Sequence, residues 1–256
     1  MSNLFWLSDE QMERLKPFLP KSHGKPRVDD RRVLSGIIFI NRNGLRWCDA
    51  PREYGPPKTL YNRWKRWGEM GVFARMMEGL ASEGGEEKVV MIDATYLKAH
   101  RTASSLRAKK GGPDDQRGRL IGRTKGGLNT KLHAVTDAKG RPLRFFMTAG
   151  QVSDYTGAAA LLGSLPAAEW LIADRGYDAD WFRDALKDKG IRPCIPGRKS
   201  RGKAVRYDRR RYKRRNRIEI MFGRLKDWRR IATRYDRCPK VFLSAVALAA
   251  TVLFWL

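Results

Sequence analysis

The chain is poor in the residues that build disulfide frameworks and soft metal sites. It contains three cysteines and three histidines in 256 residues. Cys48, Cys194 and Cys238 lie far apart and match no paired spacing typical of a disulfide or a zinc site, and the histidines form no ligand cluster. We therefore expect a protein of a reducing compartment, the cytosol.

Long hydrophobic runs are also missing. The longest, Val241 to Leu256, is apolar for 16 residues apart from Ser244 and Thr251, and a membrane span needs ~20 such residues. No basic segment followed by an apolar one opens the chain as a signal peptide would. The C-terminal run predicts a buried helix, with Pro239 in its first turn, and no membrane partner is expected.

Acidic residues are scarce and basic residues are concentrated. The chain has 53 Lys and Arg against 27 Asp and Glu, a formal net charge of +26. Residues 97–131 carry a net charge of +8 and residues 197–256 a net charge of +15, whereas residues 132–196 are balanced. An excess of this size indicates nucleic acid or an anionic membrane surface as a partner.

The first third of the chain predicts short helices. Ser8 and Gln11 form a capping box, and Asp29 is placed to cap a second helix. In the stretch 59–67, Leu60, Trp64 and Trp67 have helical spacing and face inward. The side chains predicted to face outward include Asn62, Arg63 and Arg66. This pattern resembles a helix-turn-helix DNA reader; the alternative is a helical cap whose aromatic stripe is simply core.

Beyond a hinge at Gly84 and Gly85 the pattern changes to strands. The apolar runs 89–92 and 170–173 are typical of strands buried on both faces, and each ends on an aspartate, Asp93 and Asp174. One such aspartate could be an ordinary turn-former. Two of them, with a glutamate on a later helix, indicate a site.

The order of elements predicts the fold class. A hairpin of strands at 131–137 and 143–149 follows the first buried strand, and helices then alternate with the strands at 170–173 and 191–195. This order predicts an α/β, ribonuclease H-like core with a mixed sheet and flanking helices. We expect domains at 1–83 and 84–256, with the basic, glycine-rich stretch 97–127 as a DNA-contacting insertion of the second.

The glutamate stands in the basic stretch from Tyr212 to Lys226. As a helix, this stretch places Tyr212, Arg215, Glu219 and Lys226 on one face, with a single carboxylate among cations. A carboxylate in such a surface suits a metal ion that faces a polyanion. The alternative is a solvated basic helix with one stray glutamate.

Asp93, Asp174 and Glu219 together offer three hard oxygen donors, which suit Mg²⁺. Two such ions ~3.5–4 Å apart can activate an attacking oxygen and stabilise a leaving one in an in-line displacement at phosphorus. The chain has no Walker-type glycine-rich loop, which argues against an ATP-driven enzyme.

At this point the residues resemble a known family, the DDE transposases of bacterial insertion sequences. The motifs Ile-Asp-Ala-Thr-Tyr around Asp93 and Ala-Asp-Arg-Gly-Tyr around Asp174 look like its acidic motifs. The segment 212–226 matches the signature Tyr-x2-Arg-x3-Glu-x6-Lys at every position, and 216–235 is similar to the insertion sequence five group.

The resemblance implies a set of roles. Asp93, Asp174 and Glu219 would be catalytic and hold two Mg²⁺ ions, with Mn²⁺ as a substitute. Arg215 and Lys226 would contact DNA near the scissile phosphate, and Tyr212 would stack on or orient a nucleotide. The further candidates for DNA contact are Arg175, Asn62, Arg63 and Arg66, the last three as readers of the terminal inverted repeat.

The implied function is DNA transposition by a homodimer that holds two DNA ends. Water cuts the ends of the element, and the freed 3′-hydroxyls attack target DNA by transesterification. Two rivals stay open: a metal-dependent nuclease of the same fold, which would cut without joining, and a non-catalytic DNA-binding regulator derived from a transposase.

Overall fold

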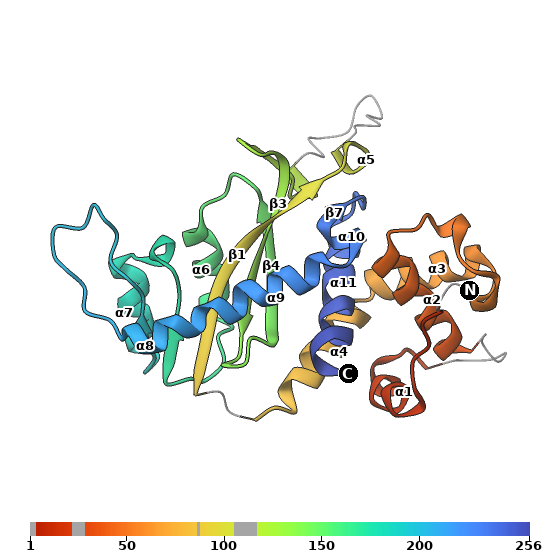
Figure 1. The fold of residues 1–256 in the computed structure, drawn as a ribbon, viewed down its shortest axis with the longest axis horizontal. Coiled ribbons are helices and arrows are strands. Elements are labelled where there is room, and N and C mark those ends of the chain that lie inside the picture. Colours follow the sequence, from red (N-terminus) through yellow and green to blue (C-terminus); the bar gives the residue numbers. More distant parts are fainter. Residues whose placement is uncertain (1–3, 22–28, 86–87, 105–116) are drawn as a thin grey trace.

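A computed structural model describes residues 4–21, 29–85, 88–104 and 117–256 of the chain. Its first part is helical, as the sequence predicts, and lies at one end of the molecule (Figure 1). Ser8 caps the first helix through a complete capping box, and the Asp29 side chain accepts a hydrogen bond from the Arg31 N–H at the start of the second. The helices are α1 (Asp9–Leu15), α2 (Asp30–Asn43), α3 (Pro57–Glu69) and α4 (Val72–Ser82).

The rest of the described chain forms a mixed sheet with flanking helices. The seven-stranded sheet has the order β2-β3-β1-β5-β6, with β4 added to β3 and β7 to β1. Its strands are β1 (Val89–Ala99), β2 (Gly122–Thr124), β3 (Gly127–Thr136), β4 (Pro142–Ala149), β5 (Trp170–Ile172), β6 (Arg192–Cys194) and β7 (Thr233–Arg234). The helices of this part are α5 (Arg101–Ser104), α6 (Asp154–Leu162), α7 (Asp180–Asp188), α8 (Arg209–Tyr212), α9 (Asn216–Lys226), α10 (Arg229–Ala232) and α11 (Pro239–Ala250).

The sheet combines antiparallel and parallel strands in the predicted way. β1, β3 and β4 pair antiparallel, while β5 and β6 are added in parallel on the other side of β1. The parallel strands are reached through α6 and α7, because a parallel neighbour requires a crossover connection. The predicted ribonuclease H-like arrangement of strands is therefore present.

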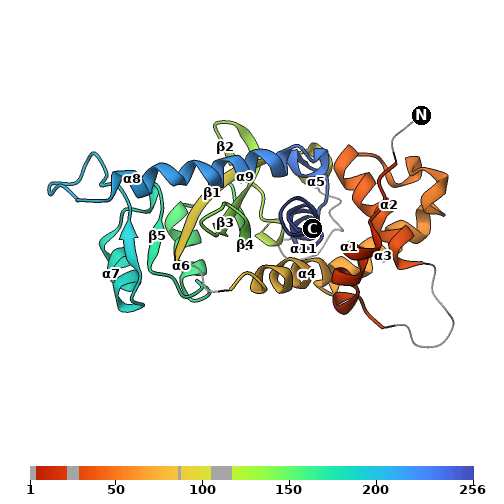
Figure 2. The same cartoon turned by 60° about the horizontal axis from the view of Figure 1, so that its bottom comes forward.

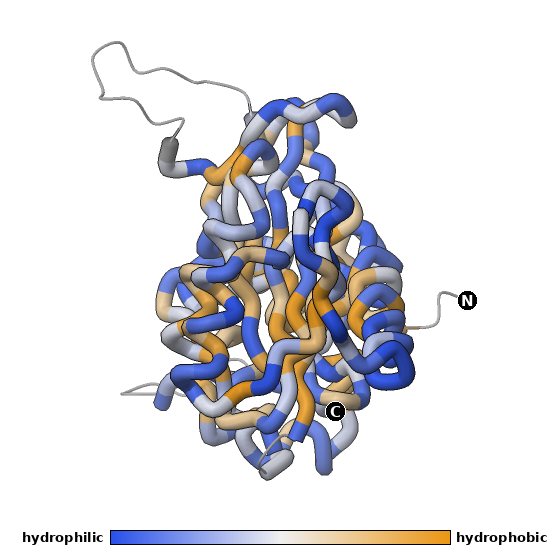
Figure 3. Tube along the Cα trace, turned by 90° about the vertical axis from the view of Figure 1, so that its left-hand side faces the viewer, coloured by the Kyte–Doolittle hydropathy of each residue, from blue (hydrophilic) through white to orange (hydrophobic). Residues whose placement is uncertain are grey.

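Alternating side chains of β1 supply two cores. Val90 and Ile92 pack with Phe182 of α7 in one cluster, and Val89 and Met91 belong to a second cluster that includes residues of α9 and α11. Successive side chains of a strand point to opposite faces, so one short run fills both layers. Figure 2 shows α8 and α9 running along one side of the sheet, and Figure 3 shows hydrophobic segments in the interior with hydrophilic segments around them.

The long strand β1 differs from the prediction in one respect that matters for the site. Asp93 was expected where its strand ends, but β1 continues to Ala99. The pairing of β1 with β5 ends near Asp93: Met91 is the last residue of β1 that pairs with β5. Up to Lys98, where β7 joins, that edge of β1 has no strand partner among the described residues. Asp93 therefore lies just beyond the last pair that β1 forms with β5.

The predicted insertion is also partly sheet. Within 97–127, Leu97 is buried in β1, 122–124 form β2, and β3 begins at Gly127. The polar residues around Leu97 obscured the end of the strand in a stretch whose composition is too polar for core. Residues 105–116 of this prediction lie outside the described residues.

The C-terminal run is the core helix expected from its length. Pro239 occupies the first turn of α11, and the run continues after this helix as a π-helical turn, Thr251–Trp255. α11 packs against α4, α3 and α2 as well as α9. No helix among the described residues is long and apolar enough to cross a membrane.

The helices before residue 84 share one hydrophobic cluster with α9 and α11. The division into domains at 83 and 84 stays a prediction. The connection between α2 and α3, from Gly44 to Pro56, contains two 3-10 turns and is longer than the tight turn of a DNA-reading helix-turn-helix.

Replacing Trp64 with alanine tests whether this cluster holds both parts together. Trp64 is 1% exposed and packs on Phe73 with ring centroids 5.0 Å apart, so the truncation should cost about 3–5 kcal/mol of unfolding free energy. Thermal unfolding should remain a single transition, shifted downward, since α11 ties the N-terminal helices to the sheet. The exposed neighbour Lys65→Ala should change little. A separate early transition in the Trp64 variant would show that the helices melt independently.

Candidate active site

The two strand aspartates are neighbours because of the register between β1 and β5. Met91 pairs with Ile172 in parallel, and Asp93 and Asp174 each follow two residues later. In parallel strands in register, such positions lie side by side at the same end of the pair. The fold therefore brings together two residues that are 81 positions apart in the chain.

Backbone amides orient both carboxylates. Asp93 is 8% exposed, and its Oδ1 accepts a hydrogen bond from the Ala94 N–H at 2.9 Å. Asp174 precedes a 3-10 turn formed by 175–177 and caps it: its Oδ1 accepts the Gly176 N–H at 2.8 Å. Each aspartate thus has one oxygen fixed by the main chain.

Glu219 comes from α9, which crosses β1 (Figure 1). Asp93 points to the same face of β1, since it bonds to Arg215 just before α9. Ile218, Met221, Phe222 and Leu225 of α9 are buried, at the spacing of one helical face. Glu219 lies at the border of this face, and its side chain is 55% exposed. The predicted helix is confirmed, although a 3-10 turn (213–215) interrupts it between α8 and α9.

Arg215 joins two of the three acids. Its Nη2 donates to Asp93 Oδ2 at 2.9 Å, and its Nη1 donates to Glu219 Oε1 at 2.7 Å. The arginine side chain is only 18% exposed. A planar guanidinium can serve two carboxylates at once through its fixed fork of donors. In this arrangement the guanidinium of Arg215 balances part of the negative charge of Asp93 and Glu219.

The pKa of Asp93 shows that the acids share one environment. This pKa is raised from 3.8 to about 6, first by burial and then by the charges of Asp174 and Glu219, against the opposing effect of Arg215. For Arg215, burial lowers the pKa, but Asp93 and Glu219 outweigh that effect and raise it. Negative charge is thus concentrated around Asp93, and Arg215 is the cation bonded to it.

The donor set fits a divalent cation such as Mg²⁺, which prefers a few carboxylate oxygens and retains water ligands. Among the described residues, however, no group of three acids, histidines or cysteines lies close enough together to hold an ion. The guanidinium of Arg215 lies between Asp93 and Glu219 instead. Ion binding at these residues would require Arg215 to leave at least one of them and the exposed Glu219 side chain to turn inward.

The other residues predicted on this helix lie on either side of Glu219. Lys226 is half-buried and donates to Thr95 Oγ1 of β1 at 2.7 Å. Tyr212 packs edge-on against Tyr207, and its pKa, raised first by burial, also responds to Arg215 and Asp174. Arg175 is exposed on the turn after Asp174. Tyr212 and Arg175 therefore lie near the acids, while Lys226 lies farther along β1.

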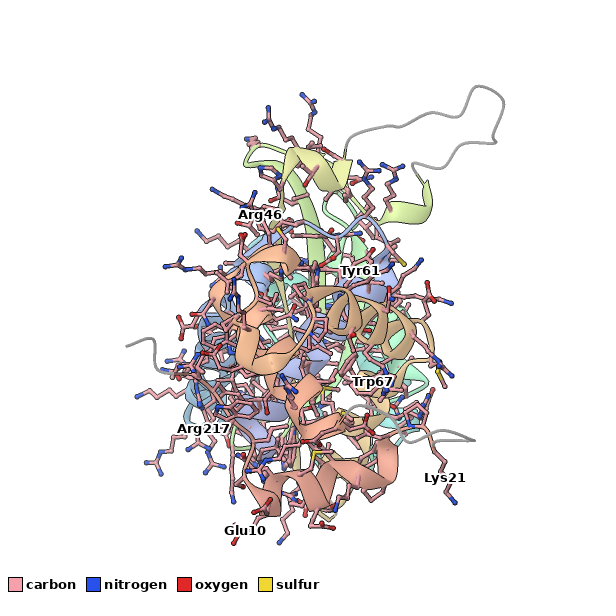
Figure 4. The ribbon with its side chains drawn as sticks, turned by 90° about the vertical axis from the view of Figure 1, so that its right-hand side faces the viewer. Glu10, Lys21, Arg46, Tyr61, Trp67 and Arg217 are labelled. Atoms are coloured by element: carbon pink, nitrogen blue, oxygen red, sulfur yellow. The ribbon has the colours of Figure 1, made fainter. Side chains whose placement is uncertain are left out.

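The candidate DNA readers of α3 are remote from the acids, at the end of the molecule opposite α8 (Figures 1 and 4). Asn62 and Arg66 are exposed, as predicted. Arg63 is not: its side chain is 15% exposed, it pairs with Asp30 at 2.9 Å, and its guanidinium lies over the Trp67 ring. Helical spacing alone does not reveal that an acid on α2 reaches this arginine.

Sequence reasoning missed three residues around the site. Thr95 follows Asp93 by two positions on the same strand face, a signal that the alternation of β1 contains. Tyr177 ends the turn that Asp174 caps, and Asp154 begins α6. Neither has a local pattern that indicates proximity to the acids, because the contacts depend on the packing of α6 against the turn.

The raised pKa of Asp93 makes the stability of the metal-free protein depend on pH. Because folding raises this pKa, the folded state binds the proton more tightly than the unfolded state, so the contribution is present below pH ~4 and is lost as the pH rises through about 6. The change corresponds to about 3 kcal/mol. Urea unfolding from pH 4 to 8 should show wild type losing stability relative to Asp93→Asn. Parallel pH profiles of unfolding free energy for the two proteins would contradict this role of Asp93.

Comparisons with known proteins identify the family of the chain. A family described as "Transposase DDE domain" matches residues 84–254, and "Putative transposase of IS4/5 family" matches residues 7–77. A putative transposase for insertion sequence element IS6501 of Brucella ovis is 38% identical over 130 residues, covering 50% of this chain and 99% of that protein. The putative transposase for insertion sequence element IS402 of Burkholderia cepacia is 30% identical over 182 residues, covering 60% and 83%.

A solved structure shows the same fold at low sequence identity. The piggyBac transposase, in a synaptic complex with hairpin DNA, aligns with a TM-score of 0.53 and 7% identity, covering 97% of this chain and 72% of that one. The likeness supports the fold alone, while the family matches cover both the helical part and the sheet that carries the acids. The chain belongs to the DDE-domain transposases of the IS4/5 type.

Proposed function

We propose that this transposase cuts and joins DNA at the site formed by Asp93, Asp174 and Glu219. The observation that carries the proposal is the convergence of three carboxylates from β1, the turn after β5 and α9 on one region. There Asp174 and Glu219 both raise the pKa of Asp93, and Arg215 compensates part of the charge. Such a concentration of charge costs stability. Clusters of this kind are typical of functional sites.

Divalent ions bound by these acids, two Mg²⁺ or Mn²⁺, would supply electrophilic stabilisation to the attacking and leaving oxygens of a phosphodiester. The residues of the chain provide orientation. Asp93 and Asp174 each keep one oxygen on a backbone amide. The other oxygen of Asp93 is bonded to Arg215 and would become available to a new ligand when Arg215 leaves. Glu219 is the adjustable member, since its side chain is the more exposed of the two bonded to Arg215.

Arg215 acquires a second role once it leaves the acids. The exposed border of α9 lets a released guanidinium reach toward a phosphate, for which its planar donors are suited. Tyr212 offers an aromatic face one turn before it, and Arg175 lies exposed across the site. Lys226, two turns beyond Glu219, would contact the phosphate backbone of the same DNA strand.

Cutting and joining are both displacements at phosphorus, so one site can perform them in succession without an energy-rich cofactor. In the first step water attacks and a 3′-hydroxyl leaves; in the second, that hydroxyl attacks a phosphodiester of the target and the neighbouring 3′-oxygen of the target leaves. The substrate would be duplex DNA carrying the terminal inverted repeats, with Asn62 and Arg66 of α3 as exposed contacts. Two ends must be held together, which points to a homodimer. Because the substrate is DNA, this homodimer would work at the nucleoid.

Replacing Asp174 with asparagine should separate binding from chemistry. End-labelled duplex with the element's flanks is incubated with a target plasmid and Mg²⁺, and products joined to the plasmid are counted. Asp174→Asn and Glu219→Gln should bind the duplex as wild type does but lose joining by more than ~100-fold, beyond the effect typical of residues that only support a metal ligand.

Asp188→Asn, on the exposed end of α7, is the matched control and should retain joining. Cutting without joined product in wild type would favour a nuclease. Joining that survives in Asp174→Asn and Glu219→Gln would place the chemistry elsewhere.

A further inference from the structure

The face of β1 that packs on α6 and α7 changes character along the strand. Val90 and Ile92 are buried on this face, in a cluster with residues of α6 and α7. Side chains of a strand alternate between its two faces, so Tyr96 and Lys98 point to this same side and away from the side of Asp93. Both are exposed. The half of β1 that leads to α5 therefore presents an aromatic and a cationic side chain where the other half is core (Figure 1).

A hollow of about 470 Å³ opens at these two residues. It is lined by Tyr96, Lys98, Thr124, Lys125, Gly126 and Asn129, which come from β1, from β3 and from the hairpin that joins β2 to β3. Its volume is in the range of pockets that take a small organic group. Two of these lining residues are cations, one is an aromatic ring and none is an acid. The hollow therefore suits an anionic ligand that also carries a flat ring.

The ring of Tyr96 is held in place from one face by a buried cation. Lys131 Nζ lies over the ring, 5.1 Å from its centroid, which is a favourable cation–π arrangement. That lysine is 5% exposed and donates to Asp154 Oδ1 at 2.9 Å and to the Val152 carbonyl at 2.6 Å. Tyr96 itself is 51% exposed. The protein thus fixes the ring and leaves it accessible, as stacking of a second flat ring requires.

The hairpin between β2 and β3 brings a second cation to the hollow. Asn129 Nδ2 donates to Thr124 Oγ1 at 2.7 Å and to the Gly127 carbonyl at 2.9 Å, which closes the hairpin around its tip. Lys125 is exposed at this tip, and Lys98 of β1 pairs in register with Asn129. Both lysines line the same hollow as the tyrosine ring, where they suit the phosphates on either side of a stacked base.

A second pair of rings continues this face of the sheet. Lys98 pairs with Thr233 of β7, so Tyr235, two residues further, lies on the same side as Lys98. The ring of Tyr235 packs against His100 with centroids 4.8 Å apart, and the residue is 42% exposed. Tyr96 and His100 are four residues apart on an extended segment, about 13 Å. The face thus offers aromatic rings at two places, with Lys98 between them.

We propose that this face of β1 binds single-stranded DNA, with one base stacked on Tyr96 and the adjoining phosphates in contact with Lys98 and Lys125. Bases within a duplex are stacked on one another, so an accessible ring between cations favours unpaired nucleotides. The nucleic acid is DNA because the chain belongs to a family of DNA transposases. The inference goes beyond the proposed function: the hollow lies on the side of β1 opposite Asp93 and would bind an unpaired strand whether or not the acids cut it.

Tyr96→Ala tests the stacking. Binding of the full chain to a short oligothymidylate, measured by fluorescence anisotropy, should weaken ~10-fold, whereas Tyr96→Phe should bind as wild type because it keeps the ring. A blunt duplex of the same length should bind Tyr96→Ala as it binds wild type. Both variants should keep the wild-type melting temperature, since the residue is half exposed.

Trp181→Ala is the matched control. Trp181 lies on α7 and is 46% exposed, but it does not line the hollow. This variant should bind the oligothymidylate as wild type does. Wild-type affinity of Tyr96→Ala for the single strand, an equal loss for the duplex, or an equal loss in Trp181→Ala would overturn the proposal.

The salt dependence of binding separates the lysines from the ring. Lys98→Ala combined with Lys125→Ala removes two phosphate contacts, so the slope of log affinity against log salt should become shallower by about 1.4 for the single strand. Tyr96→Ala should leave this slope unchanged, because stacking on a neutral ring releases no counterions. A wild-type slope in the double lysine variant would overturn the assigned phosphate contacts.

Discussion

The bridge that Arg215 makes between Asp93 and Glu219 is the interaction on which the site depends. Asp93 is buried beside two other acids, and like charges in a poorly solvated place repel one another strongly. The guanidinium supplies the missing positive charge and connects β1 to α9 through two short hydrogen bonds. In the proposed function, this guanidinium occupies in the ion-free protein the place that the charge of the cations would take.

The proposed function would couple ion binding to DNA contact through this bridge. A cation at the acids and the guanidinium of Arg215 compete for the same carboxylate oxygens, so binding of one favours release of the other. The released arginine is then available for a phosphate on a surface that is already strongly basic. In the proposed function, charge compensation within the protein would be exchanged for compensation by ions and charge pairing with DNA.

The frame around the site explains its precision and its one adjustable part. The register of β1 with β5 fixes Asp93 and Asp174 relative to each other, and the main chain holds one oxygen of each. Glu219 stands on a separate element, α9, whose buried face packs on the sheet and on α11. The strand acids are therefore preorganised, while the helix acid has freedom to turn.

Much of this could be predicted from the sequence, because the features are local. The apolar runs before Asp93 and Asp174, the spacing around Glu219 and the order of strands and helices are periodic patterns, and the structure contains them. Features that depend on tertiary contacts could not be predicted: the continuation of β1 past Asp93, the pairing of Arg63 with Asp30, and the position of Tyr177. Each depends on a contact with residues far away in the chain, which no local sequence pattern indicates.

The most direct test is to locate the ions. Crystals of the protein with a duplex carrying the element's end, grown with Mn²⁺, should show anomalous density bonded to carboxylate oxygens of Asp93, Asp174 and Glu219, with the guanidinium of Arg215 moved from Asp93 toward a phosphate. Manganese bound elsewhere, or an intact bridge from Arg215 to both acids beside bound DNA, would contradict the account.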